Sequence, residues 1–271
     1  DQPIAKTPFQ SPVTRLLQQA AAQPDAIALV TADKSWHYGE LEAASAAVSH
    51  WLQCNGIGKG DNVAVLADRS AGVVTSLLGV LRAGAVFSVL DTAYPVERLS
   101  SYVRMLKPKA LLVATTDDHA LLTALKPALE ESGCTLQFSA TNALSARSGE
   151  RSGERSGERH DLQRRAYVAF TSGTTGEPKG IAGRFEPVAH FVDWYIEEYA
   201  VSARDRFSLL SGLAHDPLLR DIFVPLAAGA TLVIPPQKLL ADPEGLLRWF
   251  AQEKITCTHL TPAMCRVLTA S

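Results

Sequence analysis

The segment from Phe170 to Gly180, "FTSGTTGEPKG", gathers hydroxyl side chains, flexible backbone and one cation directly after an apolar run. Gly173 and Gly176 allow backbone N–H groups to turn toward an anion, because glycine tolerates the dihedral angles that such a turn requires. Lys179 adds a compact positive charge. Hydroxyl donors come from Ser172, Thr174 and Thr175. This combination of groups is suited to binding the phosphates of a nucleotide.

The loop matches neither of the two common glycine-rich nucleotide motifs. Pro178 precedes Lys179 and Gly180 follows it, which departs from G-x-x-x-x-G-K-[ST]. The sequence also lacks G-x-G-x-x-G, which argues against a dinucleotide-binding fold. On composition alone, an ordinary polar loop between a strand and a helix remains the alternative.

The elements that must position this loop alternate between strands and helices. Short apolar runs rich in β-branched residues predict buried strands, and segments with helical spacing lie between them. Such alternation predicts an α/β fold with parallel βαβ units, arranged as two packed sheets flanked by helices. The predicted strands are 26–31, 62–67, 86–90, 110–115, 207–210, 231–234 and 255–260. The predicted helices are 38–54, 70–82, one after Pro95, 186–199, 218–227 and 243–253.

A low-complexity repeat divides the chain. Residues 147–165, "RSGERSGERSGERHDLQRR", carry Ser-Gly-Glu-Arg three times, and the repeat holds no apolar residue to bury. We therefore expect a flexible insertion at 146–165. It separates a first α/β subdomain, residues 1–145, from a second, residues 166–271, which contains the glycine-rich loop.

Composition excludes several classes of protein. A net charge of −2 on 271 residues gives no reason to expect nucleic acid or an anionic membrane as partner. The longest apolar runs fall short of 18 residues, and no signal peptide opens the chain. Four scattered cysteines without zinc-ligand spacing predict free thiols, no metal site and a cytoplasmic location. Because the chain begins with Asp1, we expect it to derive from a longer protein.

The order of residues in "YVAFTSGTTGEPKGI" resembles the phosphate-loop signature of the adenylate-forming superfamily, which includes acyl-CoA synthetases, luciferases and peptide-synthetase adenylation domains. Three other segments support the resemblance. "WHYGEL" (36–41) is similar to the first core motif of the family, and "GVLRAGAVFSVLDTAYPVERL" (79–99) to the second, in its amino-acid-activating version. "SPVTRLLQQAAAQPDAIALV" (11–30) resembles the entry segment of an adenylation domain. The chain is thus identified as the N-terminal part of such a domain.

This resemblance implies a reaction with ATP and Mg²⁺. A carboxylate attacks the α-phosphate, and an acyl-adenylate and pyrophosphate form. The loop would hold the β- and γ-phosphates, and the matching positions are Thr171, Ser172, Gly173, Thr174, Thr175, Gly176 and Lys179. The implied partners are a carrier-protein domain, whose phosphopantetheine accepts the activated amino acid, and neighbouring synthetase domains in the parent chain.

The resemblance also implies a substrate pocket around residues 210–232. Asp216 falls where the family binds the amino group of the amino acid, although it could equally cap the following helix ahead of Pro217. Pro217, Arg220 and His259 take pocket-lining positions, and together with Asp216 the set resembles that of aminoadipate reductases. Arg220 suggests a substrate with a second carboxylate, but it could instead pair with Asp221. His215 shapes the site or is simply packed.

Several family motifs would lie beyond Ser271, including the adenine- and ribose-binding motifs, the hinge and the lysine of the C-terminal lid. We therefore expect no catalytic residue within this incomplete chain, and no turnover by the chain alone. One alternative is a truncated or degenerate ATP-binding or docking module. The other is an acyl-CoA synthetase, which the second motif and Asp216 disfavour.

Overall fold

The computed structural model describes residues 10–115, 119–140, 163–172 and 178–270. The Ser-Gly-Glu-Arg repeat and residues 173–177 of the glycine-rich loop lie outside these ranges. The predictions that fall on Gly173, Thr174, Thr175 and Gly176, and on the insertion, therefore stay predictions.

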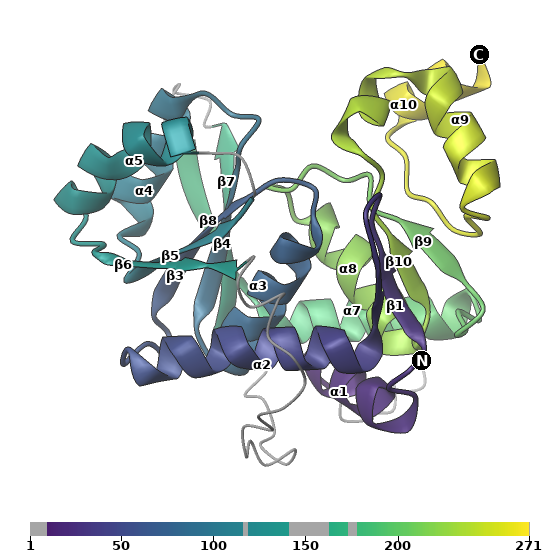
Figure 1. The fold of residues 1–271 in the computed structure, drawn as a ribbon, viewed down its shortest axis with the longest axis horizontal. Helices are drawn as coiled ribbons and strands as arrows, with labels where there is room; N and C mark the ends of the chain where they lie inside the picture. Colours follow the sequence, from purple (N-terminus) through teal and green to yellow (C-terminus); the bar gives the residue numbers. More distant parts are fainter. Residues whose placement is uncertain (1–9, 116–118, 141–162, 173–177, 271) are drawn as a thin grey trace, which may run out of the picture.

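The described residues form two β-sheets flanked by helices, as the sequence predicted (Figure 1). The six-stranded sheet has the order β6-β5-β3-β4-β7-β8, and the four-stranded sheet has the order β2-β1-β10-β9. The strands are β1 (Ile27–Val30), β2 (Ser35–His37), β3 (Asn62–Ala67), β4 (Val86–Asp91), β5 (Ala110–Ala114), β6 (Leu136–Ser139), β7 (Arg165–Ser172), β8 (Pro178–Arg184), β9 (Arg206–Ser208) and β10 (Thr231–Val233).

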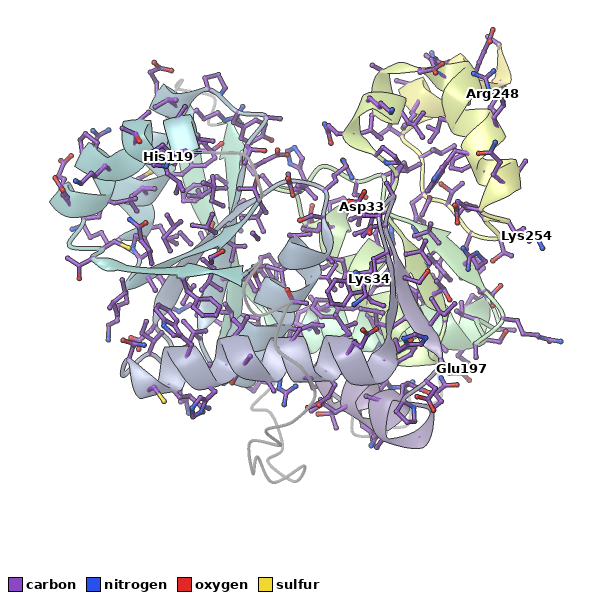
Figure 2. All side chains as sticks on the ribbon, viewed as in Figure 1. Asp33, Lys34, His119, Glu197, Arg248 and Lys254 are labelled. Atoms are coloured by element: carbon purple, nitrogen blue, oxygen red, sulfur yellow. The ribbon has the colours of Figure 1, made fainter. Side chains whose placement is uncertain are left out.

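Helices cover both sheets. They are α1 (Pro12–Ala22), α2 (Tyr38–Cys54), α3 (Ala71–Arg82), α4 (Val96–Leu106), α5 (His119–Glu131), α7 (Phe185–Glu198), α8 (Pro217–Ala228), α9 (Pro243–Gln252) and α10 (Pro262–Thr269). In Figure 1 the long helix α2 runs along the lower side of the molecule, from one sheet to the other. Figure 2 shows side chains packed through the space between the sheets, with charged residues such as Arg248 and Lys254 at the periphery.

The two sheets do not correspond to two halves of the sequence. Strand β1 pairs with β10 in parallel, and the β7–β8 hairpin extends the sheet of β3, β4 and β5. Each sheet therefore draws strands from both sides of the repeat, so the expected boundary at 145 and 166 is not a boundary between sheets. Hydrophobic periodicity predicts a strand but not its partner, which is why the sequence could not reveal this exchange.

Helices α2 and α3 approach each other closely where they cross beside the six-stranded sheet. At Gly79 in α3, an added Cβ atom would lie 2.5 Å from the Cβ of Val48 in α2 and 3.0 Å from the carbonyl oxygen of Ser45. Only glycine fits this crossing without displacement of a neighbour. The residue belongs to the segment 79–99 that resembles the second core motif.

One predicted strand is wrong. Residues 255–260 form no ladder, and their only pairing with a named strand is a single parallel bridge between Phe207 and Cys257. The segment instead runs as an extended connection that ends at α10, which Thr261 caps by accepting a hydrogen bond from the Met264 N–H. This connection brings His259 beside α7 and α8.

Two further predictions concern cysteines and membranes. Cys54, Cys134, Cys257 and Cys265 are all free thiols. Among the described residues, no helix has the length and apolarity needed to cross a membrane.

Candidate functional site

Helix α8 carries two of the predicted pocket residues, Pro217 and Arg220, and a third, Asp216, directly precedes it. Pro217 occupies its first turn, where the missing N–H has no helical partner to lose, and Gly229 ends it in the left-handed conformation with φ of 79°. Asp216 stands at the N-cap position but makes no side-chain capping hydrogen bond. The capping alternative for Asp216 is therefore not realised, and its carboxylate stays exposed at the start of the helix.

His215 and Asp216 lie together at the edge of a small cavity. The Tyr94 hydroxyl and the Nε2 atom of His215 are 3.2 Å apart, so His215 is linked to the turn after β4. The cavity is lined by Phe87, Val89, Tyr167, Val168, Ala169, Leu213, Ala214, His215, Asp216, Leu218 and Leu219. Its volume of about 20 Å³ corresponds to roughly one water molecule.

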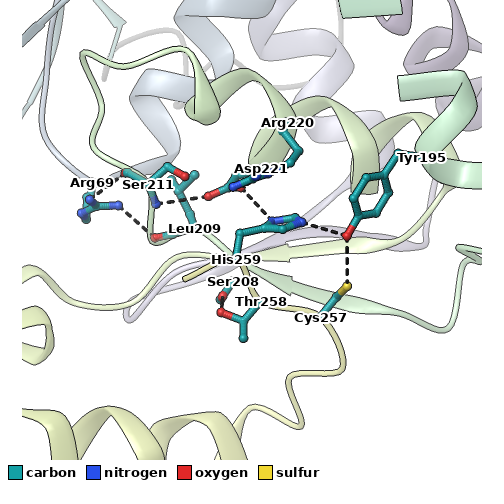
Figure 3. Close-up of polar contacts among 10 residues, drawn as sticks. All are labelled: Arg69, Tyr195, Ser208, Leu209, Ser211, Arg220, Asp221, Cys257, Thr258 and His259. Atoms are coloured by element: carbon teal, nitrogen blue, oxygen red, sulfur yellow. Dashed lines mark hydrogen bonds and ion pairs between the residues drawn. The ribbon is translucent and has the colours of Figure 1, made fainter. Parts of the chain in front are cut away.

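Arg220 and His259 meet at a third residue, Asp221 (Figure 3). Arg220 Nε donates to Asp221 Oδ1 at 3.2 Å, and His259 Nδ1 lies 2.9 Å from the same oxygen. The Ser211 N–H donates to Oδ2 of Asp221 at 3.1 Å. On its other side, His259 Nε2 is 2.8 Å from the Tyr195 hydroxyl of α7. The alternative in which Arg220 pairs with Asp221 is thus realised.

The Asp221 side chain is fully buried, with an exposed fraction of 0%. Burial by itself would raise the pKa of its carboxyl group, but hydrogen bonds from His259 and Ser211 and the charge of Arg220 outweigh it, so the pKa lies below its ordinary value. Burial raises the pKa of the Tyr195 phenol, and the neighbouring Cys257 adds to that effect. The cluster therefore holds a carboxylate beside a neutral phenol.

Arg69 fixes the loop that precedes α8. Its guanidinium donates to the carbonyl oxygens of Leu209 at 2.9 Å, Leu210 at 3.3 Å and Ser211 at 2.8 Å. Arg69 follows β3, whereas the loop follows β9, so these contacts join the two sheets directly behind Asp221.

The phosphate loop is flanked by the two strands of a hairpin. Thr171 of β7 pairs with Lys179 of β8, and Ser172 pairs with Pro178, in antiparallel register. Thr171 and Lys179 are exposed, and no carboxylate in the described part of the chain forms an ion pair with Lys179. An exposed ammonium group at the mouth of the loop fits a phosphate ligand.

Mg²⁺ does not need a dedicated protein cage, because it commonly binds through substrate phosphates and one or two carboxylates. The residues that the structure describes hold no cluster of three or more metal-ligating side chains. Thr171 and Lys179 offer a hydroxyl group and an ammonium group to phosphate oxygens, and Mg²⁺ would be held through those phosphates.

The predicted substrate-pocket residues form two groups rather than one. His215, Asp216 and Pro217 lie at the start of α8, whereas Arg220 and His259 join through Asp221 one turn further on. Sequence reasoning did not name Tyr195, Tyr94 or Arg69, and it considered Asp221 only as an alternative partner of Arg220. A signal for Asp221 was available, because "LLRDIFV" places a single carboxylate within an apolar helix, and such a carboxylate needs partners.

The two-sheet α/β fold is that of the N-terminal subdomain of adenylate-forming enzymes. The chain belongs to the AMP-binding enzyme family, whose sequence pattern matches residues 16–271.

Its relatives include aminoadipate reductases and peptide synthases. The chain is 36% identical over 255 residues to the L-2-aminoadipate reductase of Schizosaccharomyces pombe, a match covering 87% of this chain and 18% of that protein. It is 32% identical over 243 residues to a linear gramicidin synthase of Brevibacillus parabrevis, covering 90% of this chain and 5% of the other. The AMPPNP-bound form of the nonribosomal peptide synthetase FmoA3 aligns with a TM-score of 0.82 and 25% identity, covering all of this chain and 27% of that one.

The chain thus spans about a fifth of the length of the aminoadipate reductases that it matches.

Proposed function

We propose that this chain is part of an enzyme that uses ATP to activate an amino acid as its aminoacyl-adenylate. The observation that carries the proposal is the β7–β8 hairpin, which sets an exposed Lys179 opposite Thr171 where the glycine- and threonine-rich segment begins and ends, with no ion pair to Lys179 from the residues that the structure describes. Membership of the AMP-binding family supports it.

In the proposed reaction, a carboxylate oxygen of the amino acid attacks the α-phosphorus of ATP, and the bond to the bridging oxygen breaks to release pyrophosphate. Lys179 and the hydroxyl and N–H groups of the loop hold the β- and γ-phosphates and stabilise the charge of the leaving group. Bound Mg²⁺ would neutralise part of the phosphate charge. The acyl group would then pass to the phosphopantetheine of a carrier-protein domain.

The proposed substrate is a dicarboxylic amino acid similar to aminoadipate. Asp216 would bind its ammonium group, because the Asp216 carboxylate is exposed and has no ion-pair partner among the described residues. Arg220 would bind the carboxylate that is not activated, since a planar guanidinium pairs with a carboxylate through parallel hydrogen bonds. His215 and Pro217 would shape the wall between these two contacts.

The test is pyrophosphate exchange by the complete protein that contains this chain, with a panel of amino acids. Dicarboxylic substrates should give the highest kcat/KM, and Arg220→Leu should abolish that preference. The matched control is Arg248→Leu, which removes an exposed arginine on α9. Preference of the unmutated protein for a neutral aliphatic amino acid would refute the substrate assignment, while exchange itself would still support adenylation.

The panel should include compounds blocked at either carboxyl group, because the proposal leaves open which carboxyl is activated. Residues 1–271 alone are proposed to lack exchange, because none of their motifs matches the one that carries the lysine of the family's lid. Robust exchange by this segment would contradict that part of the proposal.

A further inference from the structure

Both ring nitrogens of His259 are already engaged by protein groups. Asp221 carries a carboxylate, which can only accept, so the hydrogen lies on Nδ1 of His259 and is donated to Asp221 Oδ1 at 2.9 Å. In the neutral ring, Nε2 must then accept, and the Tyr195 hydroxyl at 2.8 Å is its donor. The His259 side chain is only 14% exposed. It offers no unused nitrogen to a substrate.

Asp221 is held from three directions. Oδ1 accepts from His259 and from Arg220 Nε, while Oδ2 accepts from the Ser211 N–H in the loop that Arg69 braces. With no exposure to solvent, this carboxylate cannot turn without leaving a donor unpaired in the interior. Asp221 is therefore a rigid anchor for whatever is bonded to it.

Arg220 is bonded to this anchor only through Nε. No hydrogen bond joins its two terminal nitrogens to another group in the described part of the chain, and the side chain is 28% exposed. Because a guanidinium is planar, fixing Nε fixes the direction in which the terminal nitrogens point. The charges of Arg220 and Asp221 balance, so the terminal nitrogens form the outer end of a neutral pair.

We propose that Asp221 and Tyr195 are positioning residues for the substrate carboxylate. The Tyr195 hydroxyl fixes the orientation of the His259 ring, and His259 in turn holds the Asp221 carboxylate in place (Figure 3). Asp221 then orients the guanidinium of Arg220, so that its terminal nitrogens face the substrate. His259 supports this arm through both of its ring nitrogens. The inference rests on the proposed function, and it deepens it by naming the residues that set selectivity for a second carboxylate.

The decisive variant is Tyr195→Phe, which removes one hydroxyl group and keeps the ring. Loss of the hydrogen bond between Tyr195 and His259 should raise KM for the dicarboxylic substrate more than it lowers kcat. The ratio of kcat/KM values, dicarboxylic over neutral amino acid, should fall about five- to tenfold, as expected for one hydrogen bond. The matched control is Tyr199→Phe. Its ring packs on that of Tyr195 at 4.5 Å, and no hydrogen bond joins it to His259. This control should leave the ratio unchanged.

Asp221→Asn is the second variant. The amide keeps the shape, but its NH₂ group meets either the Ser211 N–H or the donors of His259 and Arg220, so the anchor fails in both orientations. The ratio should fall at least tenfold, with Asp221→Glu restoring part of it. Where Asp221→Asn does not fold, Tyr195→Phe decides.

The wild-type protein is measured first, because its result tests the proposed substrate class separately from the positioning role of Tyr195 and Asp221. Preference for a neutral amino acid sinks the proposed substrate class. If wild type prefers dicarboxylic substrates and Arg220→Leu erases that preference, but Tyr195→Phe matches Tyr199→Phe within twofold, then the positioning role is overturned and the proposed function stands.

Discussion

The guanidinium of Arg69 donates a 2.8 Å hydrogen bond to the carbonyl oxygen of Ser211, whose own N–H donates to Asp221. Arg69, which follows β3 of the six-stranded sheet, thereby fixes the backbone of Ser211, which follows β9 of the four-stranded sheet. That backbone in turn holds the buried carboxylate of Asp221. Burial lowers the pKa of Arg69, and the carboxylates of Asp91 and Asp221 partly oppose that shift.

Replacement of this arginine should destabilise the protein. Arg69→Leu leaves three carbonyl oxygens without their donor, and we expect a loss of about 2 to 4 kcal/mol in the free energy of unfolding. Urea denaturation measures the loss. The control is Arg104→Leu, which breaks an exposed pair with Glu131 and should cost under about 1 kcal/mol. Equal effects of the two variants would contradict the bracing role.

The crossing of α2 and α3 gives a second prediction. Gly79→Ala should lower the free energy of unfolding by about 1 to 3 kcal/mol, because the new methyl group overlaps Val48. At Gly58, by comparison, an added Cβ atom would meet only the Ala83 carbonyl oxygen at an ordinary 3.6 Å. Gly58→Ala should therefore change stability by less than about 1 kcal/mol. A harmless Gly79→Ala would show that the helices separate easily.

A third prediction concerns the hairpin. In the complete protein, Lys179→Ala should reduce kcat/KM for ATP about tenfold or more, since one charge-assisted contact contributes roughly 1.5 to 3 kcal/mol. The thermal midpoint should not change, because the side chain is exposed. Lys126→Ala on α5 serves as the control for loss of an exposed lysine. Unaltered ATP kinetics in Lys179→Ala would favour the ordinary polar loop.

The buried carboxylate predicts a dependence of stability on pH. The pKa of Asp221 in the folded protein lies below its ordinary value of about 3.9, so its ionised form stabilises the fold above that pH. This contribution is lost as pH falls through the lower, folded pKa. The difference in unfolding free energy between wild type and Asp221→Asn should therefore shrink from pH 6 to pH 3. Glu244→Gln, an exposed change on α9, should show no such trend.

Local patterns predicted much of this fold. The helix Tyr38–Cys54 and the strand Asn62–Ala67 match the expected ranges at both ends, because the helix has a clear period and the strand is a clearly bounded apolar run. Residues 255–260 were misjudged, because a short segment rich in β-branched residues looks the same in a strand and in an extended connection. Helix α5 was not predicted at all, and Pro127 within it is a residue that usually argues against a helix.

The site was predicted less completely than the fold. A motif identifies residues by their place along the chain, so it found Arg220 and His259. It could not show that Asp221 lies between them, because that depends on how α8 and the segment after α9 pack in three dimensions. Tyr195 entered the cluster for the same reason, from a helix that carries no family motif.

The exchange of strands between the sheets has a consequence for synthesis on the ribosome. The Tyr38 hydroxyl donates to the carbonyl oxygen of Ala230, which lies 192 residues later, and β1 pairs with the similarly distant β10. At roughly 5 to 20 residues per second, the first hairpin would stand without its neighbour for about 10 to 40 s after it emerges. During that interval the apolar residues Ala28 and Leu29, which are buried in the finished fold, would be exposed, and we expect a chaperone to cover them.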